Sequence, residues 1–146
     1  MKLTAFTDYS LRVLIYLAAD TTRRATIAEI AAAYGISEHH LVKVVHFLGK
    51  RGWIETVRGK GGGILLAMAP AQLNIGRVVR DTEGAALPAE CFSEDGGHCV
   101  ITSSCRLKNV LGEAVKAFYA VLDRYTLDDI ARNRAALGKV LMIRAA

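Results

Sequence analysis

The chain has 146 residues, of which 52% are hydrophobic, and its formal net charge is +5. This length suits one domain with an appendage, and the apolar fraction excludes a disordered tail. No apolar run approaches the roughly 18 residues that a membrane-spanning helix requires. Asp8 and Arg12 interrupt the first apolar stretch, which argues against a signal peptide, so we expect a cytoplasmic protein without a membrane partner.

The charge is distributed unevenly along the chain. Residues 1–80 contain eleven Lys/Arg against five Asp/Glu, a net charge of +6, whereas residues 81–105 contain five acidic residues and no basic one. Residues 106–146 return to a net charge of +4. A basic N-terminal module suits an anionic partner, although a solvated basic surface without any partner fits the charge alone equally well.

The first third of the chain predicts three helices. The first covers about Thr4–Ala19, where apolar residues recur at helical spacing. A capping box, Thr26–Glu29, begins the second helix, and Gly35 suits its left-handed C-cap. Ser37 caps a third helix that ends near Gly52. Two short helices separated by a tight glycine turn predict a helix-turn-helix.

A β-hairpin is predicted directly after the third helix. Trp53–Val57 and Ile64–Met68 read as its strands, and the connecting turn Arg58–Gly63 is basic and rich in glycine. A hairpin at this place is a wing, so we predict a mostly α, winged helix-turn-helix fold. The glycine-rich tip could also suggest a nucleotide-binding loop, but it lacks the Lys-Ser/Thr ending of a P-loop and no helix follows it directly.

The second half predicts a cysteine-bearing loop between two helices. Asn74 caps a short helix, the loop runs from about Gly84 to Cys105, and Thr126 caps a last short helix. Between loop and last helix, apolar residues recur at three- and four-residue steps over about five turns. They are Leu107, Val110, Leu111, Ala114, Val115, Phe118, Val121 and Leu122.

This long helix has little of its own chain to pack against. We therefore expect it to pair with the same helix of a second copy in a symmetric homodimer; packing only on its own domain is the alternative. The predicted organisation is a winged helix-turn-helix DNA-binding domain at 1–83, a cysteine-bearing loop at 84–105, and a dimerisation helix with a C-terminal helix at 106–146.

Candidate DNA contacts come from the third helix and the wing. Side chains near the start of a recognition helix read base edges in the major groove, whereas its far end and the wing reach the backbone or the minor groove. The predicted DNA-binding residues are Ser37, Glu38, His39, His40, Lys43, Lys50, Arg51, Arg58 and Lys60. Each could instead be a solvated surface residue. A dimer would present two such helices, so the expected partner is double-stranded DNA with a roughly palindromic operator.

The three cysteines of the chain, Cys91, Cys99 and Cys105, fall within fifteen residues. An odd number cannot pair completely into disulfides within one chain, but three thiolates on a loop can hold a metal centre with a fourth ligand from elsewhere. Two other interpretations remain open on the residues alone. His98 could complete a zinc site, and Cys99 with Cys105 could form a thiol switch.

Several segments resemble the Rrf2 family of winged-helix transcription regulators, which bind iron–sulfur clusters. These segments are Leu3–Arg12, Val57–Ile64, Ile75–Arg80, Ile101–Lys108 and Leu122–Leu127. The likeness covers nearly the whole chain and is greatest to the nitric-oxide-sensing repressors of the family. In the family's regulators of cluster biogenesis, a histidine ligand lies three residues after the last cysteine; Lys108 stands there in this chain, which disfavours that role.

The resemblance implies a ligand set for the cluster. Cys91, Cys99 and Cys105 would ligate it, with a 4Fe-4S cluster favoured over a 2Fe-2S cluster, and Asp8 of the partner subunit would supply the fourth ligand. A carboxylate is a hard ligand, held weakly beside three soft thiolates, so one iron would stay open to a small diatomic molecule. Asp8 also precedes Arg12 by four residues, an ordinary surface ion pair on a helix.

These observations predict a switch and a function. If loss of the cluster frees Asp8 to pair with Arg12, the first helix could shift and carry the recognition helix with it. We expect a homodimeric repressor, not an enzyme, and the resemblance implies that nitric oxide releases it from its operator by nitrosylating the cluster. The alternatives are a regulator of the same family that answers a redox or iron signal and, in a different class, an iron–sulfur redox protein.

Overall fold

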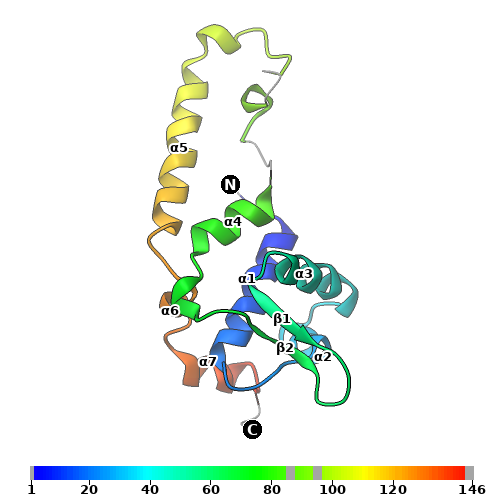
Figure 1. Cartoon of the computed structure of the whole chain (residues 1–146). Coiled ribbons are helices and arrows are strands. Elements are labelled where there is room, and N and C mark those ends of the chain that lie inside the picture. Colours follow the sequence, from blue (N-terminus) through cyan, green and yellow to red (C-terminus); the bar gives the residue numbers. More distant parts are fainter. Residues whose placement is uncertain (1, 85–87, 94–96, 144–146) are drawn as a thin grey trace.

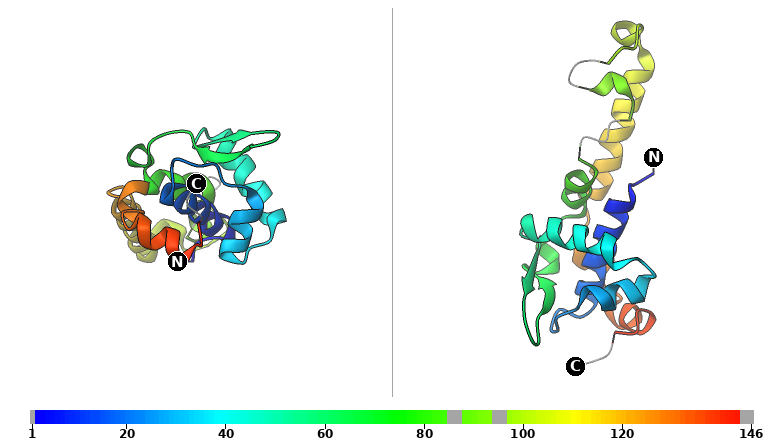
Figure 2. Two further views of the ribbon diagram at one scale, coloured as in Figure 1. Left: turned by 90° about the horizontal axis from the view of Figure 1, so that it is seen from below. Right: turned by 90° about the vertical axis from the view of Figure 1, so that its right-hand side faces the viewer.

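The protein consists of a compact base and a long projecting helix (Figure 1). The computed structural model describes residues 2–84, 88–93 and 97–143. The base contains residues 2–84 and 123–143, and the helix Arg106–Leu122 (α5) extends away from it with the cysteine-bearing residues at its far end (Figures 1 and 2). Among the described residues, no helix combines the length and the apolar character needed to cross a membrane.

The helix-turn-helix forms where local capping signals predict it. Helix α1 covers Ala5–Ala19, α2 covers Ile27–Tyr34 and α3 covers Glu38–Lys50. Thr4, Thr26 and Ser37 each accept a hydrogen bond from a backbone N–H in the following turn, and Thr26 forms the complete capping box with Glu29. Gly35 ends α2 at φ +63°, a left-handed conformation that glycine adopts without steric cost.

The wing is a two-stranded antiparallel hairpin. Strand β1 covers Ile54–Val57 and β2 covers Gly63–Leu66, with Ile54 opposite Leu66 and Val57 opposite Gly63. The predicted hairpin is confirmed, with each strand shorter than predicted at its open end. A third segment joins the sheet, because Ala25 forms an isolated antiparallel bridge with Ile64 on the free edge of β2. Nothing in the sequence pattern indicated this bridge, which ties the α1–α2 loop to the wing.

The remaining helices pack around α1 or extend from the base. A 3₁₀ turn at Pro70–Gln72 precedes α4, Ile75–Glu83, which Asn74 caps as predicted. Two further 3₁₀ turns, Glu90–Phe92 and Thr102–Ser104, lie in the cysteine-bearing part. After α5, Arg106–Leu122, the chain returns to the base as α6, Leu127–Ile130, and α7, Arg134–Val140. Both final helices contact α1.

The hydrophobic core lies entirely within the base. Fully buried leucines and isoleucines come from α1, α2, α3, the segment before α4, and α6, so residues from both ends of the sequence share one core. The largest of these side chains are Leu14, Ile30, Leu41, Leu48, Leu73 and Leu127. In contrast, no side chain of α5 is buried. The base therefore packs the recognition elements around a shared core, while α5 has no buried side chain.

Acidification is expected to weaken this fold through its capping carboxylates. Hydrogen bonds from Thr126 hold the pKa of Asp129 below its usual 3.8. Burial opposes the shift at Glu29, yet hydrogen bonds from Thr26 and Arg23 lower the pKa of that carboxyl below 4.5. A lowered pKa contributes stability above the unfolded-state value, and this is lost as pH falls through the folded-state value. Melting by circular dichroism should give a constant Tm above about pH 5 and a falling Tm below about pH 4; an unchanged Tm at about pH 3 would contradict this.

Candidate nucleic-acid interface and cysteine segment

Helix α3 has a buried face and a polar exposed face. Leu41, Val44, Val45 and Leu48 are buried against the base, so the opposite side is turned to solvent. Of the residues predicted to contact DNA on this helix, Glu38, His39, His40, Lys43 and Lys50 are all exposed, as is the capping residue Ser37. The Ser37 hydroxyl lies 3.1 Å from His40 Nδ1, so the capping residue and one of the three histidines of the helix are held together.

One residue of this exposed face, His46, was not among the predicted DNA-binding residues. His46 is exposed and follows Lys43 by three residues and His39 by seven, so the three side chains share one stripe of the helix with Lys50. The helical spacing alone would have found it. The stripe gives α3 a row of cationic or titratable groups suited to phosphates and base acceptors.

The far end of α3 is braced against α4. Arg51 Nη1 lies 3.7 Å from Asp81 Oδ2, and the Arg51 guanidinium lies 5.3 Å from the ring centroid of Phe47. Phe47 and Tyr34 are half-buried and pack against the core, whereas Leu41 is fully buried. Arg51 therefore has an intramolecular role in addition to any contact with the DNA backbone.

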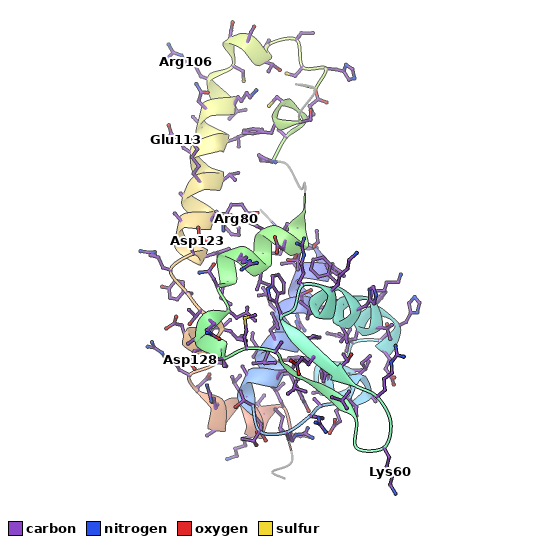
Figure 3. The ribbon with its side chains drawn as sticks, in the orientation of Figure 1. Lys60, Arg80, Arg106, Glu113, Asp123 and Asp128 are labelled. Carbon is purple, nitrogen blue, oxygen red and sulfur yellow. The ribbon has the colours of Figure 1, made fainter. Side chains whose placement is uncertain are left out.

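The tip of the wing carries two exposed cations. Arg58 and Lys60 are both exposed, and Lys60 points away from the body of the protein (Figure 3). Gly59 and Gly61 adopt φ values of +91° and +76°, so the turn that presents these side chains needs glycine on either side of Lys60. Recognition helix and wing tip together form the candidate nucleic-acid interface.

The cysteine segment, defined as residues 88–93 and 97–105, lies at the opposite end of the molecule along α5 (Figure 1). Its three cysteines are free thiols and half-buried, whereas His98 is exposed. The turn Glu90–Phe92 leans on α5, since a Cβ on Gly112 would lie 3.7 Å from the Phe92 ring and the Lys108 ammonium lies 5.9 Å from its centroid.

Close backbone packing brings the chain before Cys99 against the 3₁₀ turn that carries Cys91. A Cβ at Gly97 would lie 2.7 Å from the Glu90 carbonyl oxygen and 3.4 Å from Cys91 N, so the chain leading to Cys99 runs directly against the chain that carries Cys91. Cys105 is the N-cap residue of α5. Within the described ranges, no three His, Cys, Asp or Glu side chains are gathered closely enough for a single metal ion.

Asp8 lies on α1 in the base and forms the predicted ion pair. Arg12 Nε lies 3.0 Å from Asp8 Oδ1, and Arg12 Nη2 lies 2.8 Å from Asp8 Oδ2. The Arg12 guanidinium also lies 5.7 Å from the ring centroid of Tyr34, at the end of α2. Burial raises the pKa of Tyr34 to about 12, so this phenol stays neutral beside the pair.

A polar clasp between α4 and the end of α5 joins the projecting helix to the base. Arg80 donates from Nη1 and Nη2 to the two carboxylate oxygens of Asp123, both at 2.6 Å, and lies 4.4 Å from the ring centroid of Tyr119. Asn74 Nδ2 donates to the Asp123 carbonyl oxygen at 2.7 Å. At Gly76 a Cβ would overlap the Asp123 carboxylate. We call Arg80, Tyr119 and Asp123 the α4–α5 clasp.

The recognition helix, its wing and the basic charge they carry define a winged helix-turn-helix DNA-binding protein. The family model described as "Iron-dependent Transcriptional regulator", Rrf2, matches residues 3–133. The chain belongs to the Rrf2 family and is a DNA-binding transcriptional regulator. Since the relatives are named as regulators, a non-enzymatic class, they also support the expectation that it is not an enzyme.

Individual relatives show which regulators of this family the chain is similar to. The chain is 52% identical over 145 residues to the HTH-type transcriptional regulator NsrR of Geobacillus kaustophilus, covering 99% of each sequence. Among solved structures, it is similar to CymR, titled the global cysteine regulator of B. subtilis, with 30% identity and a TM-score of 0.70 over 91% of this chain and 98% of that one. IscR of T. potens gives 27% identity and a TM-score of 0.72 over 91% and 88%.

Proposed function

We propose that this protein is a homodimeric repressor that senses nitric oxide through an iron–sulfur cluster and leaves its operator when the cluster is nitrosylated. One observation carries the proposal: three free, half-buried thiols sit at the start of a helix whose other end is clasped to the DNA-binding base. The resemblance to nitric-oxide-sensing repressors, and the similarity to relatives named NsrR, support this signal.

The donor set fits an iron–sulfur cluster. Cys91, Cys99 and Cys105 would hold it, because thiolates are the usual ligands of such clusters. A cluster places its ligands on different irons, so its cysteines need not converge on one point as the ligands of a single ion do. When bound, the cluster supplies the iron that reacts with nitric oxide, and we favour 4Fe-4S over 2Fe-2S. His98, exposed in this structure, is the ligand that a zinc site would require instead.

The fourth ligand is proposed to be Asp8 of the partner subunit. Within one protomer Asp8 belongs to the base and the cysteines to the far end of α5, so a contact between them requires a second copy. The described side chain is 43% exposed and paired with Arg12, and it can therefore exchange one partner for the other at modest cost. When Asp8 leaves the cluster and pairs with Arg12, the Arg12 guanidinium would take the position that it has in this structure, beside Tyr34 at the end of α2.

The homodimer is proposed to form through α5. Leu107, Val110 and Val121 are 61%, 59% and 46% exposed, and apolar side chains at such spacing are normally covered by a partner helix. Two copies would present two α3 helices to DNA, which suits a roughly palindromic operator with half-sites about one turn apart. DNA, a second copy and nitric oxide are thus the proposed partners, and the protein would act in the cytoplasm.

Anaerobic purification followed by DNA binding tests the proposal. The protein should be brown, contain iron and sulfide, and bind a duplex selected from random-sequence DNA; nitric oxide should then lower its affinity about 100-fold. A regulator that answers a redox or iron signal would respond to oxidant or chelator but not to nitric oxide. An iron–sulfur redox protein would show no sequence preference for DNA, and either result contradicts the proposal.

The Asp8→Ala variant tests the proposed fourth ligand independently of the three cysteines. The variant should retain iron but show a shifted visible spectrum and a changed response to nitric oxide. Arg12→Ala is the matched control for the visible spectrum, because it breaks the same ion pair without removing a ligand. If Asp8→Ala leaves both spectrum and response unchanged, Asp8 is not the ligand.

A further inference from the structure

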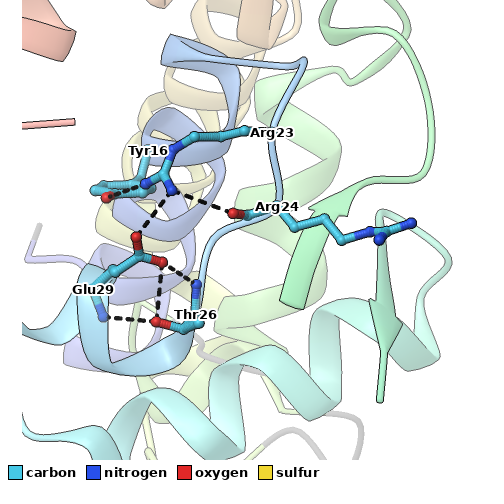
Figure 4. A network of polar contacts seen from close by, with 5 residues as sticks. All are labelled: Tyr16, Arg23, Arg24, Thr26 and Glu29. Carbon is cyan, nitrogen blue, oxygen red and sulfur yellow. Dashed lines mark hydrogen bonds and ion pairs between the residues drawn. The ribbon is translucent and has the colours of Figure 1, made fainter. Parts of the chain in front are cut away.

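Arg23 and Arg24 are adjacent in the α1–α2 loop, but their side chains point in different directions (Figure 4). Arg23 folds back and donates to Glu29 Oε1 at 2.9 Å and to the Tyr16 hydroxyl at 3.3 Å. Its side chain is only 19% exposed, so its charge is satisfied inside the base. Arg24 extends away from this network (Figure 4) and is exposed. The two residues therefore have different roles despite identical chemistry.

The backbone beside Arg24 is fastened to the wing. Ala25 N donates to the Ile64 carbonyl at 2.9 Å, and Ile64 N donates to the Ala25 carbonyl at 2.7 Å. A Cβ at Gly63 would lie 2.9 Å from the Ala25 carbonyl oxygen and from Arg24 Cβ, so only glycine permits this approach. Arg24 consequently lies beside the wing in space, although it precedes Gly61 of the wing tip by 37 positions in the sequence.

The Arg24 side chain reaches the wing tip itself. Its Nη1 donates to the Gly61 carbonyl oxygen at 3.2 Å, next to Lys60 in the turn. One hydrogen bond leaves most of the five guanidinium N–H donors free for another acceptor. In the described part of the chain, neither Arg24, Arg58 nor Lys60 forms an ion pair. Three cations without an ion pair thus lie in or beside the wing-tip turn.

The surroundings of Arg24 suit an anion. An open groove of about 470 Å³ lies between the loop and the wing, lined in part by Thr21, Arg24, Gly61 and Gly62. Guanidinium, hydroxyl and backbone N–H groups are the donors that proteins offer to nucleic-acid phosphates. The carboxylate of this loop, Asp20, accepts hydrogen bonds from Thr22 N and Oγ1 at 2.9 and 2.6 Å and is occupied by its own loop.

We propose that Arg24 is a DNA-contacting residue, whose guanidinium bridges the wing-tip carbonyl of Gly61 and a phosphate of the strand beside the groove that the wing enters. The proposal rests on the DNA-binding surface assigned above and extends it beyond the recognition helix and hairpin to the α1–α2 loop. A phosphate contact carries no base specificity. Arg24 therefore adds affinity on any sequence, and its contribution falls with salt.

Salt titration on a duplex of arbitrary sequence tests this without knowledge of the operator. The full chain would be titrated by fluorescence anisotropy against a duplex of about 30 base pairs, between about 50 and 200 mM salt. For Arg24→Gln the slope of log K against log salt should become shallower by about 0.9 for each protomer bound. Arg24→Lys keeps the charge and should keep the slope, which separates a phosphate contact from a purely structural role.

Arg124→Gln is the matched control. It removes the same charge from an exposed arginine in the turn after α5 and should leave the slope unchanged, because this turn connects α5 to α6 on the side of the base away from the hairpin (Figure 1). Equal melting temperatures would show that Arg24→Gln is folded. A wild-type slope for Arg24→Gln overturns this inference alone, whereas salt-independent binding by the wild-type chain overturns the DNA-binding surface and this inference together.

Discussion

Replacing Cys105 by serine should abolish the cluster and lower operator affinity about 100-fold, which corresponds to about 2.8 kcal/mol of coupling free energy between the two sites. Cys105 is the N-cap residue of α5 and makes no capping hydrogen bond through its side chain. Serine is a preferred N-cap residue, so Cys105→Ser should preserve or stabilise the helix while removing a ligand. The loss can then be assigned to the cluster and not to unfolding of α5.

Iron and sulfide analysis, visible absorbance and DNA affinity of anaerobically purified protein measure this result. The proposed ligands Cys91 and Cys99 should behave in the same way when changed to serine. His98→Ala is the matched control, since it changes the exposed neighbour of Cys99 and should retain both colour and affinity. A colourless wild-type protein with stoichiometric zinc, whose metal is lost in His98→Ala, would replace the cluster by a Cys₃His site.

The helix starts could be predicted from the sequence because their signals are local. Thr26 and Glu29 form reciprocal hydrogen bonds within one turn, and Asn74 accepts a hydrogen bond from Arg77 N only three residues away. The same applies to the recognition surface, where the buried face of α3 fixes which side chains remain outside. Such predictions need only the geometry of one helix, so they hold whatever the rest of the chain does.

The features that were not predicted depend on partners distant in sequence. Helix α7 was missed because its N-cap residue, Asn133, forms no capping hydrogen bond, and the helix is held by contacts with α1 instead. The bridge between Ala25 and Ile64 joins segments that show no shared pattern. Two of the segments that resemble the Rrf2 family, Ile75–Arg80 and Leu122–Leu127, lie far apart in the sequence. The structure shows that they contact each other, because Arg80 of the first forms an ion pair with Asp123 of the second.

Breaking the α4–α5 clasp should uncouple DNA affinity from the cluster. Helix α4 is the element that α5 contacts most extensively, so a rearrangement at the cysteine segment reaches the base chiefly through Arg80 and Asp123. In Arg80→Ala both the ion pair and the contact with Tyr119 are lost. The variant should still bind iron with an unchanged visible spectrum, but the ratio of operator affinities with and without cluster should fall from about 100 to less than about 10.

Gly76→Ala tests the same α4–α5 clasp without changing any charge. Its methyl group would displace the Asp123 carboxylate, so it should reproduce the reduced affinity ratio of Arg80→Ala. Arg132→Ala is the matched control for the loss of an arginine, because it breaks a surface ion pair of 2.7 Å with Asp129 that lies outside the clasp, and its ratio should remain near 100. If Arg80→Ala and Gly76→Ala both retain the full ratio, the signal does not pass through α4. It would then have to reach the recognition helix through α1, where Asp8 and Arg12 lie.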